Sequence, residues 1–372
     1  MQKFFKNDWV SLTLALILSI AGIVSIVSSE GGLIEGIPFL AKKQMIFFTC
    51  ALLIYLVISN IDYRKYTRYS IAIYSLLLFC LLAVLVVGTE RGGSQRWIIF
   101  GSYQFQPSEI GKLMMILVLA RTLTRLKNEF SDRVVFLVSL AFILPVIAFI
   151  ALEPDLGMSI TYLMIFLVMS FVSEINWRIP VTFIIITALL VPAAWPLLKD
   201  YQKNRIMTFV NPTSDPLGKG YQSNQSRIAI GSGGLTGKGL FKGTQNKLNF
   251  IPFQSTDFIF SIVGEEGGFL LSCFVVILYL LLFMRLGAIA IRAPDMQGTL
   301  IVWGITSMIF LQTFINIGMT MGIMPVTGLP LPFMSSGINS LLLNFISLGV
   351  ANSVYKYSEN ASDLSGSFVR IY

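Results

Sequence analysis

The chain has 372 residues, of which 55% are hydrophobic and only 12% are charged. A soluble domain carries about 25% charged residues, so the composition excludes an ordinary water-soluble globular fold. The net charge of +8 fits membrane topology and anionic lipid better than nucleic acid. The chain has no histidine, and its three cysteines lie in apolar runs. Histidine catalysis is therefore excluded, and iron–sulfur, zinc-thiolate and disulfide sites are disfavoured.

Ten apolar segments of roughly membrane-spanning length follow one another along the chain. They cover residues 9–28, 44–59, 69–88, 109–126, 134–152, 156–173, 179–198, 258–284, 298–321 and 333–355. Their apolar residues are continuous and do not alternate with polar ones, which argues against a β-barrel. We predict an all-α polytopic membrane protein, with residues 1–372 forming a single transmembrane domain of about ten helices.

The basic residues predict the orientation of these helices. With the N-terminus inside, fourteen lysines and arginines fall in the inner loops and ends, and four fall in the short outer loops. This bias places both termini in the cytoplasm. Residues 358–372 then form a short, polar cytoplasmic tail, which we expect to be disordered.

The same topology leaves one long extracytoplasmic loop, residues 199–256, before the eighth span. Structureless loops longer than about 15 residues are usually functional or disordered. This loop contains eight glycines and also apolar residues that could anchor it on the helices, namely Ile228, Ile230, Leu248, Phe250 and Ile251. We therefore expect it to fold back onto the bundle.

Asp257 is the first candidate for chemistry, because ionisable residues near the membrane are rare and often functional. It stands where the long loop enters the eighth span. A helix cap explains such an aspartate structurally. A carboxylate at the outer interface is equally well placed to act as a general base. Glu265 and Glu266 lie about 12 Å further along the helix, and we interpret them as buried structural groups.

Two further charged groups stand at the outer ends of spans four to six. Glu109 and Lys112 are three residues apart, on one face at the start of the fourth span, and predict an ion pair. Lys112 could also contact an anionic head group, and Arg96, beside Trp97, is either an interfacial anchor or a phosphate ligand. Glu153 and Asp155 flank Pro154 in a tight outer turn. Asp155 could hold a sugar hydroxyl or a cation there.

The glycine-rich part of the loop, NPTSDPLGKGYQSNQSRIAIGSGGLTGKGLFKGTQ, resembles a nucleotide site only superficially. A P-loop requires glycine at position 232 and Ser/Thr at 239, where this chain has Ser232 and Gly239. An anion-binding surface of backbone N–H groups remains possible. Its basic side chains would be Arg205, Lys219, Arg227, Lys238 and Lys242. A surface loop without such a role is the alternative.

Five blocks in the same order make the chain resemble the SEDS family (shape, elongation, division and sporulation) over nearly its whole length. They are RWIIFGSYQFQPSEIGK, LEPDLG, NPTSDPLGKGYQSNQSRIAIGSGGLTGKG, GTQNKLNFIPFQSTDFIFSIVGEE and NIGMTMGIMPVTGLPLPFMSSGINS. The segment GKGLFKGTQ is more similar to the RodA branch than to the FtsW branch. The chain departs from the family pattern at Phe253, where Glu is common, and at Ile338, where a second glycine is usual.

The resemblance implies a peptidoglycan glycosyltransferase that polymerises lipid II on the outer face of the bacterial inner membrane and releases undecaprenyl pyrophosphate. It implies a class B penicillin-binding protein, a transpeptidase, as partner, together with other membrane proteins of the elongation complex. The family's essential aspartate corresponds to Asp257, and its Glu/Lys pair to Glu109 and Lys112. We expect Asp257 to be the general base, and Arg96, Lys112, Arg205 and Arg227 to steady the pyrophosphate.

The leaving group is already activated, so no nucleotide or redox cofactor is required, and a divalent cation is possible although no ligand cluster demands one.

Two other functions remain open from the sequence. A flippase or transporter for a lipid-linked precursor would place charges near the middle of the spans. A non-catalytic scaffold for the transpeptidase would tolerate loss of Asp257.

Overall fold

The computed structural model describes residues 7–32, 36–91, 94–101, 103–194, 218–247 and 250–368, and also residues 196, 203 and 207–209. This part of the chain is mostly helical. Its long helices are α1 (Trp9–Ser29), α2 (Phe39–Ile58), α4 (Ser70–Val87), α5 (Pro107–Lys127), α6 (Asp132–Leu152), α7 (Leu156–Val172), α8 (Arg178–Ala194), α12 (Ile259–Ile291), α13 (Met296–Thr320) and α14 (Ile338–Phe368). The shorter helices are α3 (Tyr63–Arg68), α10 (Lys219–Ser232) and α11 (Thr244–Lys247).

The predicted apolar segments coincide with these long helices. Each segment lies largely on one of them, although residues 333–337 of the tenth segment precede α14, and residues 195 and 197–198 of the seventh fall outside the described residues. Among the described residues, seven helices are long and apolar enough to cross a membrane, namely α1, α2, α4, α6, α12, α13 and the part of α14 up to Ser358. The apolar helices α7 and α8 are shorter. The chain is therefore a polytopic helical membrane protein.

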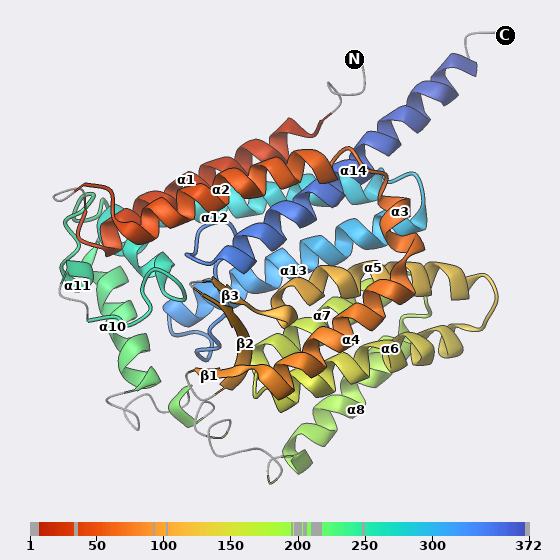
Figure 1. Cartoon of the computed structure of the whole chain (residues 1–372), viewed down its shortest axis with the longest axis horizontal. Helices are drawn as coiled ribbons and strands as arrows, with labels where there is room; N and C mark the ends of the chain where they lie inside the picture. Colours follow the sequence, from red (N-terminus) through yellow and green to blue (C-terminus); the bar gives the residue numbers. More distant parts are fainter. Residues whose placement is uncertain are drawn as a thin grey trace.

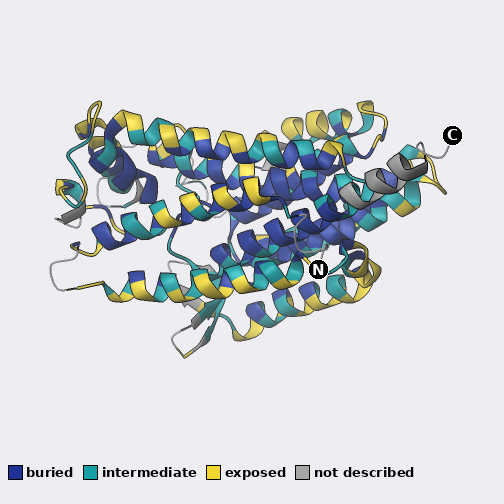
Figure 2. Cartoon of the chain, turned by 90° about the horizontal axis from the view of Figure 1, so that it is seen from above, coloured by how far each residue is buried: buried dark blue, intermediate teal, exposed yellow. Residues whose placement is uncertain are grey.

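The long helices lie side by side in one bundle (Figure 1). Helix α13 is central, because it packs against α12 and α14 on one side and against α5 and α7 on the other. Helices α1 and α2 cover α12 and α14, while α4, α6 and α8 lie on the far side of α5 and α7. Buried residues line the middle of the bundle and exposed residues its outer faces (Figure 2). This is the pattern expected for helices that face lipid, where the surface needs no polar groups.

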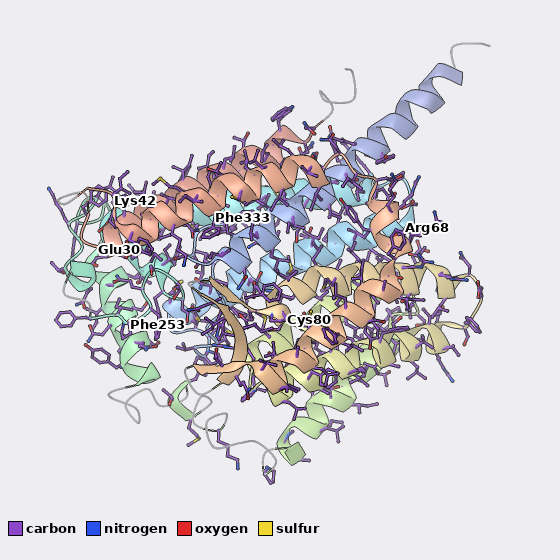
Figure 3. The ribbon with its side chains drawn as sticks, viewed as in Figure 1. Glu30, Lys42, Arg68, Cys80, Phe253 and Phe333 are labelled. Atoms are coloured by element: carbon purple, nitrogen blue, oxygen red, sulfur yellow. The ribbon has the colours of Figure 1, made fainter. Side chains whose placement is uncertain are left out.

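The two ends of the bundle differ. The first turn of α1 and the end of α14 lie at the end that carries α3 and Arg68, whereas α10, α11 and Phe253 lie at the opposite end (Figure 3). Helix α3 is capped by Asp62, whose carboxylate accepts from the Arg64 N–H at 2.9 Å. We call the end that carries α10 the loop end.

A small sheet at the loop end was not predicted, so the all-α description is incomplete. Strands β1 (Thr89–Arg91), β2 (Ser94–Phe100) and β3 (Tyr103–Phe105) pair antiparallel in that order. Thr89 lies opposite Trp97, and Ile98 opposite Phe105. Strand β2 packs against α4 and α5, and the Asn339 amide donates to the Gln104 carbonyl at 2.8 Å. The sheet therefore holds Arg96 close to the start of α5.

Two other predictions about irregular segments are revised. The tail was expected to be disordered, but α14 continues through Phe368, so that prediction is wrong for residues 358–368. The part of the long loop described from residue 218 onward folds back: α10 packs on α12, Ile230 packs against the main core, and Ile251 is buried with Ala229 and Phe258. Ile228 and Phe250 are exposed instead of acting as anchors, and Leu248 lies outside the described residues.

Candidate active site

Asp257 lies in the turn directly before α12 and is partly buried. Its backbone N–H donates to the Phe253 carbonyl at 3.0 Å. The N-cap residue of α12 is Phe258, so Asp257 stands one residue before the cap and is not itself the N-cap, which was one of the two roles that the sequence left open. The carboxylate is thus close to the positive end of the helix, although Asp257 is not the residue at which the helix begins.

The segment from Thr327 to Gly337 holds this turn in place. Ser335 donates through Oγ to the Thr256 carbonyl at 2.5 Å, and the Ser336 N–H donates to the Ser255 carbonyl at 2.8 Å. Gly328 has φ of 78°, and a Cβ at that position would lie 3.4 Å from Asp257 Oδ2. Glycine is favoured there by the positive φ, and the Asp257 carboxylate lies at ordinary contact distance from this position.

Helix α13 presents two amide side chains toward the site from one face. Asn316 Nδ2 donates to the carbonyls of Asp257, at 2.9 Å, and Leu329, at 2.7 Å. One turn earlier, Gln312 Nε2 donates to Glu109 Oε1 at 3.2 Å. Because residues four apart share a helix face, α13 connects the Asp257 turn to the start of α5.

Glu109 and Lys112 form the predicted ion pair, with Lys112 Nζ 2.7 Å from Glu109 Oε1. The lysine is fully buried and the glutamate nearly so. The pair therefore neutralises two charges inside the protein, and the Lys112 ammonium does not reach a surface where it could bind a head group directly. That part of the prediction is corrected by the burial of Lys112.

Arg96 and Asp155 form a second ion pair, between β2 and the start of α7. Arg96 Nη1 lies 2.5 Å from Asp155 Oδ2, and Asp155 Oδ1 accepts from the Met158 N–H at 3.1 Å, which caps α7. The arginine side chain is 20% exposed. A Cβ at Gly157 would lie 3.0 Å from Thr327 Cβ. The Thr327–Gly328 segment thus runs between the start of α7 and Asp257.

The basic loop residues are described only in part. Arg205 lies outside the described residues, and only the backbone of Lys219 is described. Lys238 is paired with Glu265 at 2.7 Å, so its charge holds the loop to α12. Arg227 is exposed on α10, and its aliphatic chain lies against Gly322, just after α13.

The glycine-rich loop completes a broken helix. Helix α12 is interrupted at Gly268, whose φ is 64° and ψ −160°. The N–H groups of Lys238 and Gly239 donate to the carbonyls of Glu265 and Glu266, at 3.0 and 2.9 Å. In return, the N–H groups of Phe269 and Leu270 donate to the carbonyls of Gly234 and Leu235, at 2.9 and 3.1 Å. The sequence left open an anion-binding surface of backbone N–H groups in this loop, and the amides of Lys238 and Gly239 are bonded to α12 instead.

Glu265 and Glu266 are the buried structural groups that the sequence indicated. Glu265 Oε1 accepts from Lys238 Nζ and from the N–H groups of Thr244, at 2.7 Å, and Gln245, at 3.0 Å. Glu266 Oε1 accepts from the Ser28 hydroxyl and from the Gly243 N–H. Both carboxylates therefore bind residues 238–245 to the bundle.

We expect Gly268→Ala to detach this loop. An added Cβ would lie 2.3 Å from the Gly237 nitrogen, and the backbone conformation is one that only glycine adopts readily. The variant should lose about 1–3 kcal/mol or more of stability and be cleaved faster by protease within residues 233–245. Thermal unfolding in detergent and limited proteolysis measure both effects.

Gly231→Ala is the matched control, because Gly231 lies in α10 and a Cβ there meets no atom within 4 Å. It should melt and digest like the wild type. A Gly268→Ala protein with an unchanged melting temperature and cleavage pattern would contradict the role given to the loop.

Comparison with known proteins places the chain in a family. The family model described as "Cell cycle protein" (FtsW, RodA and SpoVE) matches residues 7–360. The chain belongs to this family, the SEDS proteins.

Individual relatives agree with this assignment. The peptidoglycan glycosyltransferase MrdB of Escherichia coli K12 is 38% identical over 318 residues, which is 84% of each chain. A chain of the structure reported as "Structural coordination of polymerization and crosslinking by a peptidoglycan synthase complex" has a TM-score of 0.80 and 31% identity, with 95% of this chain and 98% of that chain covered. The rod shape determining protein RodA of Thermus thermophilus has a TM-score of 0.68 and 28% identity, with 94% and 96% covered.

The sequence did not point to Gln312, Asn316 or Gly328 as parts of the site. The signal was available: two amides four residues apart in an apolar helix are costly unless they bind a partner inside the protein. No group of three or more acidic or cysteine side chains in the described part of the chain is placed to hold a metal ion.

Proposed function

We propose that this protein is a peptidoglycan glycosyltransferase that polymerises lipid II during cell elongation. The activity is that named for its relative MrdB, and the elongation role follows its similarity to RodA. The observation that carries the proposal is the position of Asp257. It lies beside Gly328, and helix α13 connects its turn to the buried Glu109–Lys112 pair. The Thr327–Gly328 segment lies between Asp257 and the Arg96–Asp155 pair.

In the proposed reaction Asp257 is the general base. The acceptor sugar hydroxyl attacks the anomeric carbon of the donor, the bond from that carbon to the pyrophosphate breaks, and configuration at the carbon inverts. Asp257 accepts the hydroxyl proton, and undecaprenyl pyrophosphate leaves with the bonding electron pair. The exposed parts of Arg96 and Arg227 are the described cations best placed to stabilise the departing diphosphate. A divalent cation could share this task.

The topology proposed with this function places the loop end outside the cytoplasmic membrane and both termini in the cytoplasm, with ten spans. The excess of basic residues in the loops on the side of the termini supports this orientation. The similarity to a chain of a peptidoglycan synthase complex supports a class B penicillin-binding protein as partner, within a larger elongation complex.

The test is to give the purified full-length chain labelled lipid II, with and without a class B penicillin-binding protein, and to separate the products on a gel. We expect a ladder of glycan polymer. Movement of labelled lipid II across liposomes without polymer would favour a flippase. Full function in cells with Asp257→Ala would favour a scaffold.

A further inference from the structure

Glu153 is a buried carboxyl beside the site that has no role in the proposed reaction. It lies in the turn between α6 and α7, two residues before Asp155, and is 1% exposed. Asp155 uses both of its oxygens, on Arg96 and on the Met158 N–H. In contrast, neither oxygen of Glu153 makes a hydrogen bond of normal geometry within the described part of the chain. A buried carboxylate without a well-formed hydrogen bond is costly, so this environment favours the neutral acid.

The charges around Glu153 are already balanced. Arg96 on β2 neutralises Asp155, and Lys112 on α5 neutralises Glu109. The Ser108 hydroxyl on α5 and the Tyr162 phenol on α7 also face the group, and both are neutral. An ionised Glu153 would thus be a third anion against two cations inside the protein.

The expected titration of Glu153 agrees with this count. Burial, together with the negative charge of Asp155, raises the pKa of Glu153 to about 8, although Arg96 and the Ser108 hydroxyl favour the charged form. The Nε of Arg96 is also buried and has no hydrogen-bond partner among the described residues. When Glu153 loses its proton, it becomes a competitor of Asp155 for this arginine.

We propose that Glu153 is a positioning residue. Its neutral carboxyl leaves Arg96 paired with Asp155, whereas its ionised form draws Arg96 away from Asp155 and shifts the start of α7. The proposal rests on the proposed function in so far as Arg96 and Asp155 serve the glycosyl transfer.

The first test is the pH profile of lipid II polymerisation by the full-length chain. Wild-type activity should fall above pH 8, to about a tenth of its plateau one pH unit higher, because about a tenth of Glu153 then keeps its proton. Glu153→Gln mimics the neutral acid, so it should retain most of the activity at pH 7 and lose this alkaline fall. Glu30 is an exposed carboxyl at the same end of the bundle. The control variant Glu30→Gln should show the same pH profile of polymerisation as the wild type.

The second test needs no activity. The folded-state pKa of Glu153 lies above the ordinary value of 4.5, so the folded chain binds more protons than the unfolded chain between about pH 4.5 and 8. Ionisation of Glu153 therefore lowers the free energy of unfolding as pH rises through this window. In detergent, the melting temperature of Glu153→Gln should fall less from pH 5 to 8 than that of the wild type.

Two results would overturn the proposal: identical pH dependence of melting in the wild type and Glu153→Gln, or a folded Glu153→Gln that is inactive at pH 7. If no variant made polymer, the proposed function would fail, while the melting comparison would still judge the protonation of Glu153.

Discussion

Asp257→Asn is expected to reduce lipid II polymerisation by at least about 10²–10⁴-fold, the usual contribution of a positioned base. Asparagine has the same size but cannot accept the hydroxyl proton. The backbone contacts of the turn, including the Asn316 bond to the residue 257 carbonyl, do not involve the carboxylate and should persist. The variant should therefore melt like the wild type, and quantified polymer from purified protein measures the loss.

Asp62→Asn is the matched control for this change. Asp62 caps α3 at the opposite end of the bundle, and asparagine caps helices about as well as aspartate. It should keep normal activity. Polymerisation at the wild-type rate by Asp257→Asn would remove Asp257 from the reaction and with it the central assignment.

Lys112→Met is expected to produce the largest loss of stability, about 3–5 kcal/mol, because it leaves Glu109 as a buried charge without its partner. The Gln312 amide remains the donor to Glu109 and cannot replace the ammonium. The double variant Glu109→Gln, Lys112→Met removes both charges and should recover most of the melting temperature. Thermal unfolding in detergent compares the two variants.

Lys127→Met provides the comparison with a partly exposed pair. Lys127 Nζ lies 2.6 Å from Asp132 Oδ1, and each side chain is about a third exposed, so its loss should cost less than about 1 kcal/mol. If Lys112→Met were no less stable than Lys127→Met, the buried pair would not matter for the fold. A stable but inactive double variant would show that the pair also serves the reaction.

The helices and the main carboxylate could be predicted from the sequence because both depend on short stretches of chain. A continuous apolar run must form a helix in lipid, so α1, α2 and the others were found from hydropathy alone. Asp257 and the Glu109–Lys112 pair stood out because charges beside apolar runs are unusual. The spacing of three residues correctly gave the ion pair.

The contacts made by the loop end could not be predicted in the same way, since they join segments far apart in the chain. From the sequence alone, Lys238 is expected to be an accessible cation, whereas in the structure it is paired with Glu265. The glycines around position 237 indicate tight backbone geometry, but the sequence does not say whether a phosphate or a helix approaches them. The sheet at Arg96 was missed, although a Gly–Gly pair between two short runs is typical of a hairpin.

The pairing of α12 with residues 234–239 also bears on how the chain is inserted into the membrane. These residues are synthesised before α12, yet they complete the hydrogen bonds of its interrupted turn. A chain in which they failed to reach α12 would leave two carbonyls and two N–H groups without these partners, a cost of about 1–3 kcal/mol for each group that is buried away from water. Correct placement of the loop is thus a condition for the interrupted helix to form with its backbone groups hydrogen-bonded.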